Sequence, residues 1–216
     1  MDEPIPFDAV IAILRLSNKY DIHPFRQKSI QELKKVFPCT LHDYDSIYPS
    51  GTFTTLSGGK AAQSIPLARA CNTLELLPFI FYILSQIPMK VLFQCHPILP
   101  RTEMEICLLG REKLQEMRDT VALSFLIDSK SSQHCLNPTI CEQQRLLILN
   151  NLISKRLHAG VPALRKADLE KLERIFCRPC AEEKLSVHRA AREKLWNDLP
   201  SYFGLGTWEE LRSAQK

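Results

Sequence analysis

The sequence predicts an all-α protein, in which a helical hairpin is followed by a multi-helix array. A zinc knot of four cysteines could hold this array together. Three observations favour this class. Glycine is scarce, with 7 residues in 216, whereas the helix formers Leu, Glu, Lys, Arg and Ala are abundant. Apolar residues recur three and four positions apart over long stretches. The 14 prolines are spread along the chain, where they mark element boundaries and not a linker.

The first two helices are expected to form a hairpin within residues 1–37. Apolar positions from Phe7 to Leu14 share one helical face, and a second apolar stripe runs from Phe25 to Phe37. Between the two lies a short connector, in which Pro24 can open the second helix. A hairpin alone cannot bury both stripes, so this one must pack on something else.

Residues 38–60 are expected to be a surface loop that joins two helical units, because polar residues alternate there with Tyr44 and Tyr48. The sequence SGGK at 57–60 invites comparison with a phosphate-binding loop. Thr54, however, stands where such a loop requires glycine, and no strand is predicted before it. We therefore interpret SGGK as a turn.

Residues 61–216 are expected to form a helical domain. Helices are predicted at 61–71 and 74–86, and the second of them is apolar all round, as expected for the central core helix. Thr102 and Glu105 match a capping box that opens a short helix, and a separate helical run follows from 114 to 125.

The cysteines suggest a metal site in the second half of the chain. CLNPTIC supplies Cys135 and Cys141, and CRPC supplies Cys177 and Cys180. Tetrahedral zinc takes four soft ligands, and short loops deliver them in pairs. Two antiparallel helices between the pairs, divided by a loop at 158–162, would bring all four thiols together. The alternative is four ordinary buried thiols, because the five residues inside the first pair exceed the usual zinc spacing.

Two histidines offer rival ligands. His188 would lie about 12 Å along a helix from Cys180, which is too far for a shared ion. His134 is close enough in sequence to replace a cysteine. A four-cysteine site is nevertheless favoured, with Cys141 and Cys180 near helix N-termini, and His188 is expected to be a hydrogen-bonded structural residue.

The end of the chain is expected to dock on the core. Trp196 and Trp208 lie close to the C-terminus, and Thr207 with Glu210 forms a second capping box that opens a short final helix.

Composition and charge argue against several classes of protein. The net charge of +4 is mild, and acidic residues alternate with Arg189, Arg192 and Lys194, so a nucleic-acid patch is not indicated. The N-terminus is acidic and unlike a signal peptide, and the longest apolar run is far below the ~20 residues that cross a bilayer. An intracellular location is expected, with reduced thiols that favour metal over disulfides.

Three segments resemble the BTB/POZ domain proteins of fungi. Residues 7–41 (FDAVIAILRLSNKYDIHPFRQKSIQELKKVFPCTL) are similar to the last two helices of a BTB domain. The stretch ARACNTLELLPFIFYILSQ and the tail CRPCAEEKLSVHRAAREKLWNDLPSYFGLGTWEEL are similar to the following region of the same proteins. The strands and helices that precede the hairpin in a whole BTB domain are absent, so a truncated product and a divergent member both stay open.

The resemblance implies an adaptor that binds protein partners, either a cullin-type ubiquitin ligase or a second copy of itself. No catalytic constellation is evident, so the chain is not expected to be an enzyme or to bind a small-molecule substrate. Cys95 beside His96 is not a catalytic dyad, because adjacent residues do not face each other. The alternatives are a zinc-stabilised nucleic-acid-binding protein and, less favoured, a hydrolase using Cys95 or Cys107.

Overall fold

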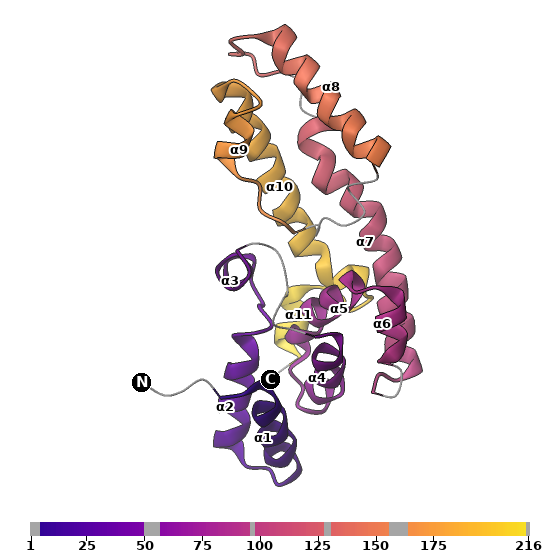
Figure 1. Cartoon of the computed structure of the whole chain (residues 1–216). Coiled ribbons are helices and arrows are strands. Elements are labelled where there is room, and N and C mark those ends of the chain that lie inside the picture. Colours follow the sequence, from indigo (N-terminus) through magenta and orange to yellow (C-terminus); the bar gives the residue numbers. More distant parts are fainter. Residues whose placement is uncertain (1–4, 50–56, 96–97, 128–130, 156–163, 215–216) are drawn as a thin grey trace. The chain divides into compact units, whose positions relative to one another are not determined.

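The chain is described by a computed structural model over residues 5–49, 57–95, 98–127, 131–155 and 164–214. These residues form twelve helices, one of them a 3-10 helix, and no strand, which confirms the predicted all-α class (Figure 1). The helices are α1 (Phe7–Lys19), α2 (His23–Lys34), α3 (Leu41–Ile47), α4 (Gly58–Ala70), η1 (Leu74–Leu76), α5 (Leu77–Gln86), α6 (Met89–Gln94), α7 (Arg101–Ile127), α8 (Pro138–Lys155), α9 (Leu169–Glu173), α10 (Arg178–Tyr202) and α11 (Trp208–Ser213).

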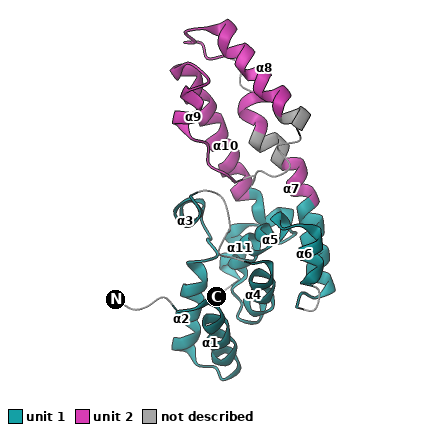
Figure 2. Cartoon of the chain, in the orientation of Figure 1, with its two compact units in different colours: residues 1–49, 53–111, 198–216 teal, residues 50–52, 112–197 magenta. Residues whose placement is uncertain are grey.

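The chain divides into two compact units (Figure 2). Unit 1 comprises residues 1–49, 53–111 and 198–216, and unit 2 comprises 50–52 and 112–197. Helices α7 and α10 each contribute residues to both units. The predicted boundaries after residues 37 and 60 do not coincide with this division.

The predicted hairpin at the start of unit 1 is confirmed. Helices α1 and α2 pack against each other, and α1 also packs against α4. Val10, Ile11 and Leu14 are buried along α1, at the spacing that gives a helix one apolar face. Asp21 turns the chain with a φ of 53°, a left-handed conformation that Asp tolerates better than most residues.

The loop predicted between residues 38 and 60 is wrong over Leu41–Ile47, which form α3. Thr40 caps this helix, because its Oγ1 accepts the N–H of Asp43 at 3.1 Å. Tyr44 is 1 % exposed, and its ring centroid lies 5.8 Å from that of Phe79 on α5. The alternation of polar and aromatic residues therefore reflects a short half-buried helix.

Helix α5 is the centre of unit 1, as its sequence predicts. Every residue from Leu77 to Ser85 is buried, and Pro78 lies in the first turn, where its missing N–H breaks no helical hydrogen bond. The ring centroid of Phe79 lies 5.8 Å from that of Tyr44 and 5.7 Å from that of Tyr48, and Phe81 stacks on Phe203 at a centroid distance of 5.3 Å. Aromatic packing on both sides thus fixes this helix in the core.

The short helix predicted at the capping box and the separate run predicted from 114 to 125 form one continuous helix, α7, of 27 residues. Thr102 lies inside its first turn and not at its cap, because the N–H of Met104 already bonds to the carbonyl of Pro100 at 3.0 Å. Gly110 lies inside α7, where its missing side chain leaves room for the ring of Phe203. An added Cβ there would lie 2.0 Å from Cδ1 of Phe203.

The C-terminal tail docks within unit 1, as predicted. Thr207 and Glu210 form the expected capping box of α11, and Trp208 and Leu211 are buried. Nδ2 of Asn72 donates to the carbonyl of Ala214 at 2.5 Å. The tail is therefore part of the core of this unit.

Unit 2 contains α8, α9 and the parts of α7 and α10 that enclose one apolar cluster. Its members are Leu123, Leu126, Cys141, Leu172, Phe176, Cys180, Ala181 and Leu185. The loop predicted at 158–162 lies outside the described residues. Two of the four cysteines proposed as metal ligands are therefore among the most buried side chains of this unit.

Candidate metal centre

Each cysteine pair straddles the start of a helix in unit 2. Cys135 precedes α8 and Cys141 lies in its first turn, while Cys177 precedes α10 and Cys180 lies in its first turn. Helix N-termini carry free N–H groups and a partial positive charge, which favour thiolate over thiol. Cys141 and Cys180 thus lie at helix starts, as expected, although burial raises the pKa of both thiols.

The four sulfur atoms gather around one point. Their Sγ atoms all lie within 4.8 Å of one another, and those of Cys135 and Cys177 are 3.7 Å apart. A disulfide needs about 2.05 Å, and all eight cysteines of the chain are free thiols. A tetrahedral ion bound at ~2.3 Å would hold its sulfurs about 3.8 Å apart. The spacing therefore suits four ligands to one metal ion.

Backbone N–H groups point at three of these sulfurs. The N–H of Ser132 donates to Cys180 Sγ at 3.3 Å, and the N–H of Cys177 donates to Cys141 Sγ at 3.5 Å. The sulfur of Cys177 accepts from the N–H groups of Cys180 and Leu136. Such donors stabilise negative charge on sulfur, as a bound metal requires.

The cysteine thiols of the cluster differ in pKa. Burial acts to raise the pKa of Cys177, but the N–H groups of Cys180 and Leu136 and the adjacent thiols of Cys141 and Cys180 together lower it to about 6. Burial raises the pKa of Cys180 to about 12 and also raises that of Cys141. Because a metal binds thiolates, it must displace the protons of the inner thiols, and its affinity rises with pH.

Lys184 is a buried cation that sequence analysis missed. It is 2 % exposed, and its Nζ donates to the carbonyl of Phe125 at 3.3 Å and lies 5.0 Å from the centroid of the Phe176 ring. Burial lowers the pKa of Lys184, and the charge of Cys180 opposes that shift. Four thiolates around a divalent ion are negative overall, which a nearby ammonium offsets. The sequence could have indicated this lysine, because Lys184 follows Cys180 by one helical turn and therefore lies on the same face of the helix.

Neither histidine joins the cluster. His188 is buried on α10, and its Nε2 donates to the carbonyl of Arg165 at 3.0 Å. Its Nδ1 is buried and accepts no hydrogen bond from the residues that the structure describes. Burial lowers the pKa of His188. His134 is exposed, and among the described residues the metal-ligand group consists of the four cysteines alone. The expectation that His188 is structural is confirmed.

The other candidates of the sequence do not form a site. Ser57 caps α4 by accepting the N–H of Lys60 at 3.3 Å, so SGGK begins a helix and not the expected turn. The thiol of Cys95 donates to the carbonyl of Val91, and His96 lies outside the described residues. Burial raises the pKa of Cys107 to about 12, so this thiol stays protonated and is a poor nucleophile.

Comparisons with known proteins identify no relative: no protein-family model, no curated protein and no solved structure matches this chain. The resemblance to BTB proteins therefore stays a prediction. Among the helices that the structure describes, none combines the length and the apolar character needed to cross a bilayer.

Proposed function

We propose that the chain is a non-enzymatic protein-interaction module whose second unit is stapled by a structural zinc ion. The ligands are Cys135, Cys141, Cys177 and Cys180. Thiolates at tetrahedral spacing suit zinc, and four protein ligands leave no coordination position open for water or substrate. The donor set therefore supports a structural metal and not a catalytic one, in a reducing intracellular compartment.

The interaction role rests on one observation, the exposed apolar tip of the α1–α2 hairpin. Leu16, Tyr20, Ile22 and Phe25 are between 42 % and 63 % exposed, and they lie at the end of α1, in the turn and at the start of α2. Clustered apolar side chains on a surface mark sites of protein contact more often than scattered ones do.

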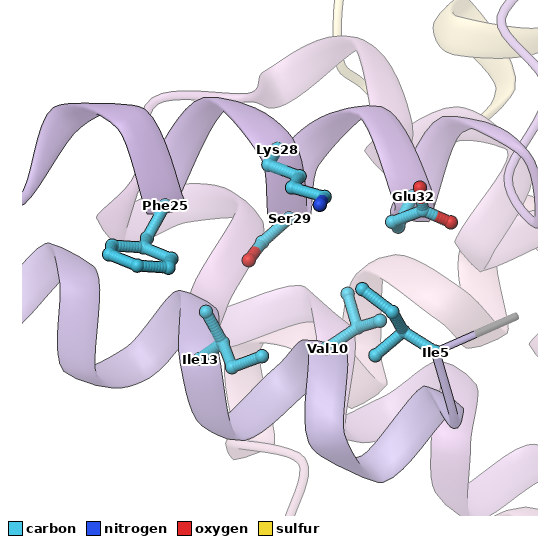
Figure 3. A pocket seen from close by; sticks show the side chains of 7 residues that line it. All are labelled: Ile5, Val10, Ile13, Phe25, Lys28, Ser29 and Glu32. Atoms are coloured by element: carbon cyan, nitrogen blue, oxygen red, sulfur yellow. The ribbon is translucent and has the colours of Figure 1, made fainter. Parts of the chain in front are cut away.

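A small groove continues this tip along the hairpin (Figure 3). It encloses about 90 Å³ and is lined by apolar side chains of both helices, with Lys28 and Glu32 on α2 beside them. Phe25 lies at one end, opposite Ile13, and Ile5 and Val10 lie toward the other. An apolar floor with charged groups at its side suits an apolar anchor from a protein partner.

The resemblance to BTB proteins indicates which partners to test first. In BTB proteins, the hairpin that this one resembles belongs to the region through which some families recruit cullin-type ubiquitin ligases, and BTB domains also serve as assembly domains. A purified cullin N-terminal domain and a second copy of this chain are therefore the two probes.

Biolayer interferometry with the cullin domain and sedimentation velocity of the chain alone test the proposal. We expect one of the two to detect a complex, which Phe25→Ser weakens at least tenfold. The matched control is Leu109→Ser, because Leu109 is 60 % exposed and lies on α7 and not on either hairpin helix. Absence of both complexes at tens of micromolar would overturn the proposal, and salt-sensitive gel shifts would favour the nucleic-acid alternative.

A further inference from the structure

The four cysteines form an inner and an outer pair. Cys141 and Cys180 are 3 % and 1 % exposed and belong to the apolar cluster of unit 2. Cys135 and Cys177 are only partly buried and pack at the edge of that cluster. The sulfurs of the outer pair also touch, at 3.7 Å. A dissolved oxidant therefore reaches the outer pair first and finds its two sulfur atoms already adjacent.

We propose that Cys135 and Cys177 are an oxidant-sensitive pair, which hydrogen peroxide converts to a disulfide that opens the metal site. This inference rests on the zinc site proposed above. It adds a modification site and a means by which the staple is released under oxidising conditions.

The reaction balances with peroxide as the only oxidant. One thiolate attacks a peroxide oxygen, which gives a sulfenic acid and releases hydroxide. The second thiolate attacks the sulfenic sulfur, forms the S–S bond and releases a second hydroxide. The two sulfurs lose two electrons and the peroxide gains them, so that two protons and one peroxide become two waters. The sulfurs must approach by about 1.7 Å, from 3.7 Å to about 2.05 Å.

The oxidised chain retains only Cys141 and Cys180 as thiolate ligands. Two ligands cannot complete a closed tetrahedral site, so zinc is lost to the solvent. The new disulfide joins positions 42 residues apart, so the segments before α8 and α10 stay covalently tethered. A thiol reductant cleaves the disulfide and restores all four ligands.

Peroxide titration of the zinc-loaded full chain tests this inference. Zinc release is followed with a chromophoric chelator, and the disulfide is located by tandem mass spectrometry of non-reduced peptides. Fragmentation within peptides is needed, because trypsin leaves Cys135 and Cys141 together. We expect release of zinc and the Cys135–Cys177 disulfide to rise together, and dithiothreitol with added zinc to reverse both.

Two results would overturn the inference. One is a disulfide that first involves Cys141 or Cys180. The other is retention of zinc at peroxide concentrations that already oxidise Cys71, a partly buried cysteine outside the cluster. The Cys71→Ser variant is the control, and its zinc release should match that of the wild type.

A second measurement separates this inference from the zinc proposal. In chelator-treated chain, iodoacetamide should modify Cys135 and Cys177 before the inner cysteines, and peroxide should still join the outer pair. If the purified chain binds no zinc but forms this disulfide, the zinc proposal fails and the reactive pair stands. If it binds zinc but the inner cysteines react first, the reactive pair fails and the zinc proposal stands.

Discussion

Replacing Gly110 by alanine tests the packing of α7 against the C-terminal tail inside unit 1. Alanine normally stabilises a helix interior by roughly 0.5–1 kcal/mol relative to glycine. Here the added Cβ would lie 2.0 Å from Cδ1 and 2.3 Å from Cε1 of Phe203. Phe203 is 3 % exposed and stacks on Phe81, so its ring cannot shift away from the added methyl group without disturbing that packing.

The expected cost follows from these distances. Overpacking of a filled core costs about 1–3 kcal/mol, and an overlap this deep belongs at the upper end. After the gain in helix propensity, Gly110→Ala should lower the free energy of unfolding by about 2 kcal/mol. For a chain of this size that corresponds to a fall in Tm of roughly 4–8 °C.

Thermal melts followed by circular dichroism measure this effect, and Gly59→Ala in α4 is the matched control. The nearest neighbour of a Cβ at Gly59 is Ser57 Oγ at 3.9 Å, so that variant should be stabilised by up to about 1 kcal/mol. Combining Gly110→Ala with Phe203→Ala should cost less than the sum of the two changes. A Gly110→Ala chain as stable as the wild type would refute the reasoning.

Two further substitutions test the buried polar groups. Burial lowers the pKa of His188, so as pH falls this side chain is protonated in the unfolded chain before it is protonated in the folded chain. The stability it contributes is complete above about pH 6.5 and is lost as pH falls through the folded-state pKa. Urea unfolding should show this loss in the wild type and not in His188→Gln, and parallel pH profiles would contradict it. Arg69→Met removes the ion pair with Glu103, which is 7 % exposed, and should lower the free energy of unfolding by about 1–2 kcal/mol. Arg101→Met removes an exposed ion pair and should lower it by less than about 0.5 kcal/mol. Equal losses in the two variants would contradict this account.

Local sequence patterns predicted the elements whose determinants are local. The hairpin follows from apolar spacing and from Pro24, and the core position of α5 follows from an uninterrupted apolar run. The four cysteines could be predicted to meet because metal ligands come in short-spaced pairs.

Elements that depend on distant partners could not be predicted in this way. Helix α3 is stabilised by the burial of Tyr44 on Phe79, 35 residues away in sequence, and no short window contains that contact. Helix α7 was predicted as two separate helical runs, and no residue near Gly110 in sequence reveals the Phe203 ring that this glycine accommodates. Tertiary packing thus determines these helices, whereas local sequence propensity alone gave the wrong prediction.

The two capping boxes show the same limit. Thr207 caps α11 as expected, whereas Thr102 has the same motif but lies one residue inside α7. The motif identifies a helix start only when the preceding residues leave the helix, and at Pro100 the carbonyl already accepts a helical hydrogen bond.

The most direct test of the four-cysteine zinc site is the metal content of the purified chain, measured by inductively coupled plasma and native mass spectrometry. The wild type and Cys71→Ser should each carry about one zinc per chain, and Cys177→Ser should lose it together with cooperative thermal unfolding of unit 2. A wild type that binds no zinc after expression with supplied zinc, and that melts as Cys177→Ser does, would contradict the account and reduce the four cysteines to core packing.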